Sequence, residues 1–217
     1  MVKVQTNSQG KVYTSNGKAL LSSSSSGKYQ LLERIKDDND TEIGTVSGFF
    51  TDSNNIEYAV VCLDAQYRSS SGVWCSNASI AVTDLPIGLD SGFWELKNTA
   101  TFNTQKIIDF CNANSYTSTA CSHCRSKSFT INNTVYYGQL PNAMEIVDIY
   151  KNRTNINNKD SSASTYSAQI LGVNIYLWCS TQRSESQSFR MTVNGYINGT
   201  TKTTSNFICP VLEIPNQ

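Results

Sequence analysis

The sequence predicts an α+β protein: a mostly antiparallel sheet with two helices, preceded by an extended N-terminal arm. Short β-rich runs, separated by turns rich in Asn, Gly, Ser and Thr, lie on both sides of two helical segments. Residues 1–27 contain few large apolar side chains and end in a run of serines, which is typical of an arm or linker. We therefore expect an arm over residues 1–40 and a domain over residues 41–217.

Composition excludes several classes of protein. The 217 residues include 17 basic and 17 acidic ones, so the chain lacks the basic face that a nucleic-acid partner requires. No apolar run reaches 18 residues, and we expect no membrane insertion. The first residues lack the apolar core of a signal peptide, which favours synthesis in the cytoplasm.

The individual elements follow from local patterns. The runs "IGTVSGFFT" and "IEYAVVCLDAQY" predict a hairpin with residues 52–55 at its tip, and "GVWCSNASIAV" adds a further strand or an ordered loop. "NTQKIIDFCNAN" predicts a helix capped by Asn103. "LPNAMEIVDIYKNR" predicts a second helix, with Pro141 near its first position.

The remainder of the chain is expected to be loop and strand. Residues 154–169 are polar and without periodicity, which predicts a long connection. The last third predicts strands in three runs: "GVNIYLWCST", "SQSFRMTVNGYING" and "SNFICPVLEI".

The stretch "ACSHCRSK" holds Cys121, Cys124 and the only histidine, His123. A zinc site needs a second ligand pair, and a redox pair needs the start of a helix after a strand; the sequence shows neither. The favoured interpretation is a short helix or turn that packs the two cysteines inward. The odd number of cysteines, seven, favours reduced, partly buried thiols over structural disulfides.

No catalytic set stands out. Cys179 lacks a histidine base other than His123, and no nucleophile-elbow, phosphate-loop or zinc-protease motif occurs. Glu145, Asp148 and Glu213 are interpreted as capping or solvated residues. We therefore expect a protein that is not an enzyme and holds no cofactor or metal.

The segment 180–207 alternates strand-like apolar positions with hydroxyl and amide side chains. Such a mixture of Ser, Asn, Tyr and Gly is typical of binding surfaces that combine rigid aromatic groups with adaptable hydrogen bonding. A plain surface sheet with polar turns explains the composition equally well.

Several segments, in order, carry a family resemblance: "IGTVSGFF", "YAVVCLD", "TATFNTQKII", the pair Cys124–Arg125, "YYGQLPNAMEIVDIYKNRTNIN", "YLWCSTQ", "FRMTVNGYING" and "SNFICPVLEI". Together they resemble the C-type-lectin-like domains of the Lcl type, which are related to the formylglycine-generating-enzyme fold. Such domains occur in bacterial surface proteins, phage fibres and retroelement-diversified proteins. The resemblance covers roughly residues 41–217. Two departures are Cys179 and Cys209, which stand where the family usually has serine and arginine.

The resemblance implies a C-type-lectin-like fold and a non-catalytic binding head. Its ligand surface would comprise Arg183, Glu185, Gln187, Asn194, Tyr196, Asn198, Lys202 and Asn206. We expect a phage virion protein, a head or tail fibre that forms a homotrimer and docks on capsid or tail proteins through residues 1–40. Its head would bind a host-surface glycan or protein. The alternatives are a bacterial surface adhesin of the same fold, or a copper or cysteine enzyme of the formylglycine-generating type.

Overall fold

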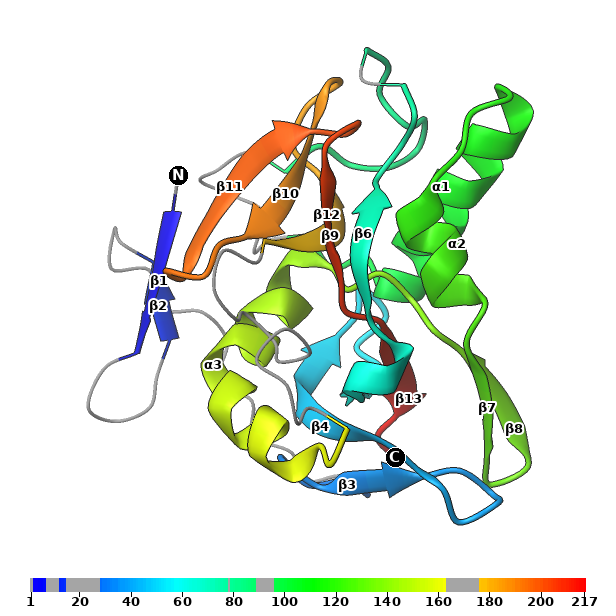
Figure 1. The fold of residues 1–217 in the computed structure, drawn as a ribbon, viewed down its shortest axis with the longest axis vertical. Coiled ribbons are helices and arrows are strands. Elements are labelled where there is room, and N and C mark those ends of the chain that lie inside the picture. The colour runs from blue at the N-terminus through cyan, green and yellow to red at the C-terminus, as the bar shows by residue number, and fades with distance from the viewer. Residues whose placement is uncertain (1, 7–11, 15–27, 78, 89–95, 163–175) are drawn as a thin grey trace.

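The largest sheet in the described part of the chain has seven strands, in the order β2-β1-β11-β10-β9-β12-β6 (Figure 1). The structure, a computed structural model, describes residues 2–6, 12–14, 28–77, 79–88, 96–162 and 176–217. The strands of this sheet are β1 (Val2–Thr6), β2 (Val12–Thr14), β6 (Ser69–Val73), β9 (Leu177–Gln182), β10 (Gln187–Met191), β11 (Tyr196–Thr201) and β12 (Ser205–Ile208). Its pairs are antiparallel except β9 with β12.

A second, four-stranded sheet has the order β13-β5-β4-β3 and is antiparallel throughout. It consists of β3 (Arg34–Lys36), β4 (Glu42–Thr51), β5 (Glu57–Leu63) and β13 (Val211–Pro215), and a separate hairpin joins β7 (Ser128–Ile131) to β8 (Thr134–Tyr137). The Asp52 carboxylate accepts hydrogen bonds from the backbone N–H groups of Asn54 and Ile56 at 2.9 Å each. These bonds fix the β4–β5 turn, and the predicted hairpin is confirmed.

Three α-helices lie in the described residues, one more than predicted: α1 (Ala100–Ala113), α2 (Thr119–Arg125) and α3 (Ala143–Lys159). A 3-10 turn, η1 (Ala65–Tyr67), follows β5. The predicted cap of α1 at Asn103 is wrong, because the hydroxyl of Thr99 caps the helix one turn earlier and Asn103 is buried within it. The third helix, α2, contains the "CSHC" motif, for which a short helix or turn was the favoured interpretation.

Helix α3 begins as predicted and ends later. The side chain of Asn142 accepts from the backbone N–H groups of Met144 and Glu145, and Glu145 bonds back to the N–H of Asn142, which makes a capping box. The predicted connection from residue 154 lies partly inside the helix, because buried Ile156 anchors its last turns against the core. The rest of that predicted connection, from residue 163, lies outside the described residues.

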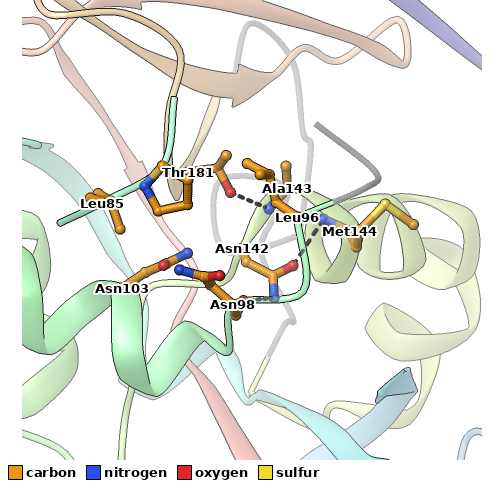
Figure 2. A pocket seen from close by; sticks show the side chains of 9 residues that line it. Leu85, Leu96, Asn98, Asn103, Asn142, Ala143, Met144 and Thr181 are labelled. Atoms are coloured by element: carbon orange, nitrogen blue, oxygen red, sulfur yellow. Dashed lines mark hydrogen bonds between the residues drawn. The ribbon is translucent and has the colours of Figure 1, made fainter. Parts of the chain in front are cut away.

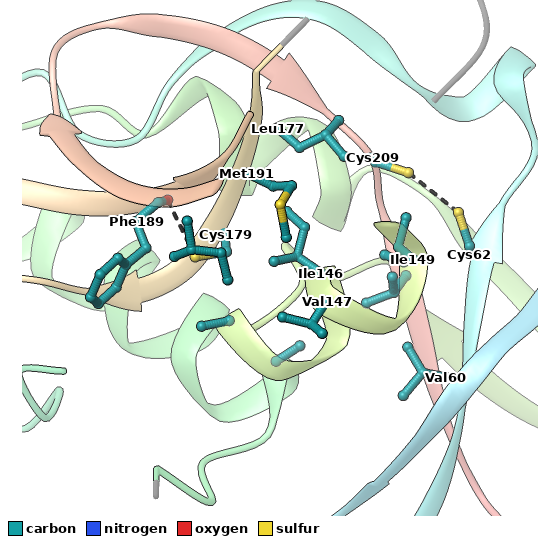
Figure 3. Packing of buried hydrophobic residues seen from close by; sticks show 14 of the residues in the cluster. Val60, Cys62, Ile146, Val147, Ile149, Leu177, Cys179, Phe189, Met191 and Cys209 are labelled. Atoms are coloured by element: carbon teal, nitrogen blue, oxygen red, sulfur yellow. Dashed lines mark hydrogen bonds between the residues drawn. The ribbon is translucent and has the colours of Figure 1, made fainter. Parts of the chain in front are cut away.

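Helix α3 packs between the two large sheets and forms the main core with both. Its residues Ile146, Val147 and Ile149 are buried against strands of the seven-stranded sheet on one side and against Val60 of β5 on the other (Figure 3). A second core joins α1 and α2 to the far face of the seven-stranded sheet through Trp74, Trp178 and Ile208. A third lies between the four-stranded sheet and the β7–β8 hairpin.

The described parts of the predicted arm pack on the same chain. β1 pairs with β11 through Val2 opposite Ile197 and Lys3 opposite Tyr196, and it also pairs with β2. β3 forms the edge of the four-stranded sheet, and the backbone N–H of buried Tyr29 donates to Asn216 at 2.8 Å. The boundary at residue 40 stays a prediction, although residues 28–40 contact the four-stranded sheet.

The predicted α+β class with mostly antiparallel sheets is confirmed, and the C-type-lectin-like fold stays a prediction. Within the described ranges, no helix is both long and apolar enough to cross a membrane.

Candidate ligand-binding site

The predicted ligand residues lie along β10, β11 and β12 and in the turns that follow β9, β10 and β11. Glu185 and Asn194 are exposed in turns, and Tyr196 is half-buried beside β1. Arg183 donates to the side-chain oxygen of Gln187 and crosses Gly199, where an added Cβ would lie 2.2 Å from the Arg183 side chain. Because Gly199 has no side chain, the Arg183 side chain can lie flat across the strand.

Lys202 is buried beneath this surface instead of facing a ligand. Its ammonium donates to the carbonyls of Ile80 at 2.9 Å and Glu185 at 2.6 Å, and to the side chain of Gln182 at 2.7 Å. It also lies 4.9 Å from the ring centre of Trp74. Burial lowers the pKa of Lys202 to about 8. The position corrects the predicted role, because three protein acceptors occupy the three donors of the ammonium group.

Arg190, which the predicted ligand set omits, organises two of its members. Its guanidinium donates to Asn198 at 3.1 Å and to Asn206 at 3.4 Å, and it stacks 4.1 Å from the ring centre of Tyr176. Asn206 is buried, so it supports Arg190 and does not itself reach the surface. The strand register places Arg190 opposite Asn198, and alternation along the hairpin is the signal that would have found this pair.

The "CSHC" motif is structural in its described surroundings. Ser118 caps α2 through the N–H of Cys121, so the motif does lie at a helix start, contrary to expectation. Cys121 and Cys124 are buried, and burial raises the pKa of both thiols, that of Cys121 to about 12. The predicted inward packing is confirmed. Arg125 donates to the side chain of Gln105.

Cys179 has the surroundings of an inert thiol. It is buried, donates to the carbonyl of Phe189 at 3.2 Å, and has a pKa raised to about 12 by burial. His123 lies 2.8 Å from the carbonyl of Tyr67 through Nε2, which assigns the ring an N–H at that position. Among the described residues, no three His, Cys, Asp or Glu side chains gather in a way that could hold a metal ion.

Two carboxyl groups, each expected to be a capping or solvated residue, come together beneath α1. Glu213 accepts from the N–H groups of Ala100 at 2.7 Å and Thr101 at 2.8 Å, and thus caps that helix. Glu145, in the capping box of α3, is its neighbour. Burial and the Glu213 carboxylate raise the pKa of Glu145 well above its ordinary value. Glu145 therefore holds its proton more firmly in the folded protein than in the unfolded chain.

This arrangement predicts a pH dependence of stability. Folding raises the pKa of Glu145. The folded protein therefore has its full stability only below the pKa of an unfolded-chain glutamate, about 4.3, and it loses stability as the pH rises from there toward the folded pKa. Glu145→Gln keeps a side-chain oxygen that accepts from the N–H of Asn142, and it cannot lose a proton, so its stability should not fall as the pH rises. We expect the variant to be more stable than wild type at pH 8, by about 1 kcal/mol or more, and the difference to shrink at pH 4.5. Urea unfolding at both pH values measures it.

Glu185→Gln, at an exposed carboxylate, is the matched control and should show no such pH-dependent gain. If Glu145→Gln is less stable than wild type at both pH values, the proton assigned to Glu145 is wrong.

A polar junction of α1, α3 and β9 offers no room for a ligand. Figure 2 shows Asn98, Asn103, Asn142 and Thr181 pointing toward one another, with Ala143 N–H donating to Thr181 at 2.9 Å. The space between them does not admit a water-sized sphere. The buried oxygen of Asn103 has no hydrogen-bond partner. We therefore interpret the junction as a structural contact that holds α1, α3 and β9 together.

Two open hollows lie side by side at the start of α1 and share Tyr58 and Thr99; we call them the Tyr58 groove. Their volumes are about 320 Å³ and 350 Å³. Their linings combine aromatic rings with amide, hydroxyl and charged side chains: Asp52, Ser53, Asn54, Tyr58, Lys97, Asn98, Thr99, Thr101, Phe102, Arg125, Val135, Tyr136, Tyr137, Gln139, Glu213 and Pro215. Such volumes are within the range of small-molecule sites.

Aromatic surface in the Tyr58 groove is available to a ligand. Tyr137 is 49% exposed and Phe102 is 41% exposed, while Arg125 lies 5.7 Å from the ring centre of Tyr137. Gln139 adds a buried side-chain oxygen that has no partner. Rings beside amide and carboxylate groups suit a ligand with both an apolar face and many hydroxyls.

Comparisons with known proteins define the fold alone. No family model matches the chain, and no curated protein matches its sequence. A solved fimbrial protein from Bacteroides ovatus is similar in structure, with a TM-score of 0.57 and 13% sequence identity. The match covers 99% of this chain and 49% of that protein, so the chain spans about half the length of its structural neighbour.

Proposed function

We propose that the protein is a non-catalytic structural subunit of an extracellular fibre or filament, whose head binds a cell-surface ligand. The observation that carries this proposal is the fold similarity to a fimbrial protein, which extends over 99% of the chain. The inert surroundings of Cys179 and the capping roles of Glu145 and Glu213 support a head without catalysis.

For the ligand we propose a surface saccharide held in the Tyr58 groove. A pyranose ring presents an apolar C–H face that packs on an aromatic ring, and its hydroxyls pair with amides and carboxylates. Tyr58, Phe102 and Tyr137 supply the rings, and Asn98 and Asp52 supply polar groups nearby. Open hollows bind weakly per site, so several copies on one fibre would provide firm attachment.

A glycan array probed with the full-length protein tests the ligand class. Phe102→Ala and Tyr137→Ala should each weaken binding to the best glycan by about tenfold. Ile80→Ala is the matched control, since Ile80 is a similarly exposed apolar side chain that does not line the groove. Loss of binding in Glu185→Ala and Asn194→Ala, with Phe102→Ala and Tyr137→Ala unaffected, would place the ligand on the β10–β11 surface instead.

We place the fibre on a phage virion, as a homotrimer attached through residues 1–40. The lectin-like resemblance and the weakly apolar N-terminal segment support this placement. Deleting residues 1–27 should leave a soluble head that no longer enters particles, measured by mass spectrometry of purified virions. Normal incorporation of the truncated protein contradicts attachment through this segment.

The second candidate is a subunit of a bacterial surface filament, which the fimbrial neighbour favours. Immunogold labelling separates the two candidates, because label on cell-attached filaments in uninfected cells supports this candidate and label on virions supports the first.

A further inference from the structure

Two cysteine pairs, formed by residues far apart in the sequence, bring their sulfur atoms almost into bonding range. The sulfurs of Cys62 and Cys209 are 3.3 Å apart, and those of Cys75 and Cys111 are 3.6 Å apart. Figure 3 shows Cys62, on β5, and Cys209, just after β12, pointing toward each other. All four are buried. A disulfide bond of about 2.05 Å requires each pair to close by only about 1.3–1.6 Å.

Each pair also has a buried cation beside it. Arg68, whose Nε donates to the carbonyl of Leu63 at 2.9 Å, lies near Cys62 and Cys209. The hydrogen bond from Cys62 and the charge of Arg68 lower the pKa of Cys209. Lys202 lies near Cys75 and Cys111, where the hydrogen bond from the Cys111 thiol and the Lys202 charge lower the pKa of Cys75. In each pair one sulfur is thus the better nucleophile and the other is its proton donor.

We propose that these pairs are disulfide sites, Cys62–Cys209 and Cys75–Cys111, which close when the protein folds in an oxidising environment. With oxidised glutathione, one cysteine thiolate attacks a glutathione sulfur and releases the first glutathione thiolate. The partner cysteine then loses its proton and attacks the mixed disulfide, which releases the second glutathione. Each pair is oxidised by two electrons, and one glutathione disulfide is reduced to two thiols.

The remaining three cysteines have other surroundings and should stay as thiols. Cys179 donates its hydrogen to the carbonyl of Phe189. Cys121 and Cys124 lie three residues apart on the same helix, and no contact between their sulfurs occurs among the described interactions. Burial raises the pKa of all three, which disfavours the attacking thiolate. The seven cysteines therefore divide into two pairs and three single thiols.

The two disulfides would stabilise the parts of the fold that hold the candidate site. One links β5 to the segment between β12 and β13, and the other links α1 to the segment after β6. Each disulfide closes a long loop of the chain. The longer the loop, the more the cross-link lowers the entropy of the unfolded state. For a chain of this length, two such links should raise the Tm by about 10 °C or more.

The test is a thiol count and a peptide map of the full-length protein, refolded with oxidised or with reduced glutathione. We expect the oxidised sample to lose four hydrogen atoms, to contain only peptides cross-linked as Cys62–Cys209 and Cys75–Cys111, and to melt about 10 °C or more higher. Refolding is used because the buried sulfurs exclude the oxidant from the native fold. A folded, oxidised sample with seven free thiols, or with other pairings, overturns the proposal.

Serine variants provide the matched comparison. Cys209→Ser and Cys75→Ser should each remove one cross-link and part of the gain in Tm, whereas Cys179→Ser should retain both cross-links. If Cys209→Ser or Cys75→Ser does not fold, the peptide map of the wild-type protein still decides the pairing. An oxidation-dependent gain in Tm that survives in the double variant Cys75→Ser/Cys209→Ser contradicts the assignment.

Discussion

Asp160→Ala is expected to lower the free energy of unfolding by about 3–5 kcal/mol, because it removes the buried carboxylate that pairs with the buried, charged Arg68 guanidinium. The side chains of Arg68 and Asp160 are 1% and 0% exposed, and the ion pair spans 2.9 Å. The Asp160 carboxylate also accepts from the backbone N–H of Ala65 at 2.7 Å. It therefore ties the end of α3 to the turn after β5. Urea unfolding monitored by circular dichroism measures the loss.

Two controls test whether the effect of Asp160→Ala comes from the burial of the ion pair and from the charge that remains on Arg68. Lys36→Ala breaks the exposed Lys36–Asp40 pair and should leave the free energy of unfolding nearly unchanged. The double variant Arg68→Met/Asp160→Asn should lose less stability than the summed losses of Arg68→Met and Asp160→Asn. The reason is that the double variant removes both charges of the buried pair. A loss for Asp160→Ala as small as that of Lys36→Ala contradicts the buried ion pair.

Lys202→Met is expected to lower the free energy of unfolding by about 2–4 kcal/mol, because it removes the donor of three hydrogen bonds, one of them to the buried side chain of Gln182. The acceptors are the carbonyls of Ile80 and Glu185 and the side chain of Gln182, which the ammonium joins across three separate segments. The measurement is urea unfolding at pH 7. Lys106→Met is the matched control, since Lys106 is partly exposed, pairs with exposed Asp84 and lies 5.5 Å from the ring centre of Phe102, and it should cost less than about 1 kcal/mol.

The same variant also tests the ligand role that the family resemblance implied for Lys202. If Lys202→Met folds with unchanged stability and loses glycan binding, Lys202 contacts the ligand and the buried arrangement is wrong. If stability falls and the remaining folded protein still binds, Lys202 supports the surface from beneath.

Sequence patterns predicted the elements whose signals are local. The hairpin of β4 and β5 follows from two β-rich runs and an Asp-Ser-Asn-Asn turn, and the start of α3 follows from Pro141, which lies close to its first residue. The end of α3 could not be predicted in the same way, because its last turns are polar except for Ile156, whose burial depends on contacts with distant strands. Tertiary packing there overrides weak local propensity.

The candidate site was less accessible to sequence reasoning. A lysine in a polar turn is ordinarily exposed, and the burial of Lys202 depends on acceptors contributed by residues 80, 182 and 185. The Tyr58 groove combines β5, the start of α1, the end of α2, β8 and β13, so none of its aromatic residues stands out in the linear sequence. The cysteine pairs likewise join positions 147 and 36 residues apart.

The central claim, a non-catalytic head that binds a saccharide in the Tyr58 groove, is tested most directly by equilibrium dialysis with the best glycan from the array. The dialysed glycan is then analysed by mass spectrometry. We predict saturable binding by the wild-type protein, at least tenfold weaker binding by Phe102→Ala/Tyr137→Ala, and complete recovery of the glycan unchanged. Equal binding by the wild-type protein and the double variant, or a glycan that is cleaved or modified, would contradict the account.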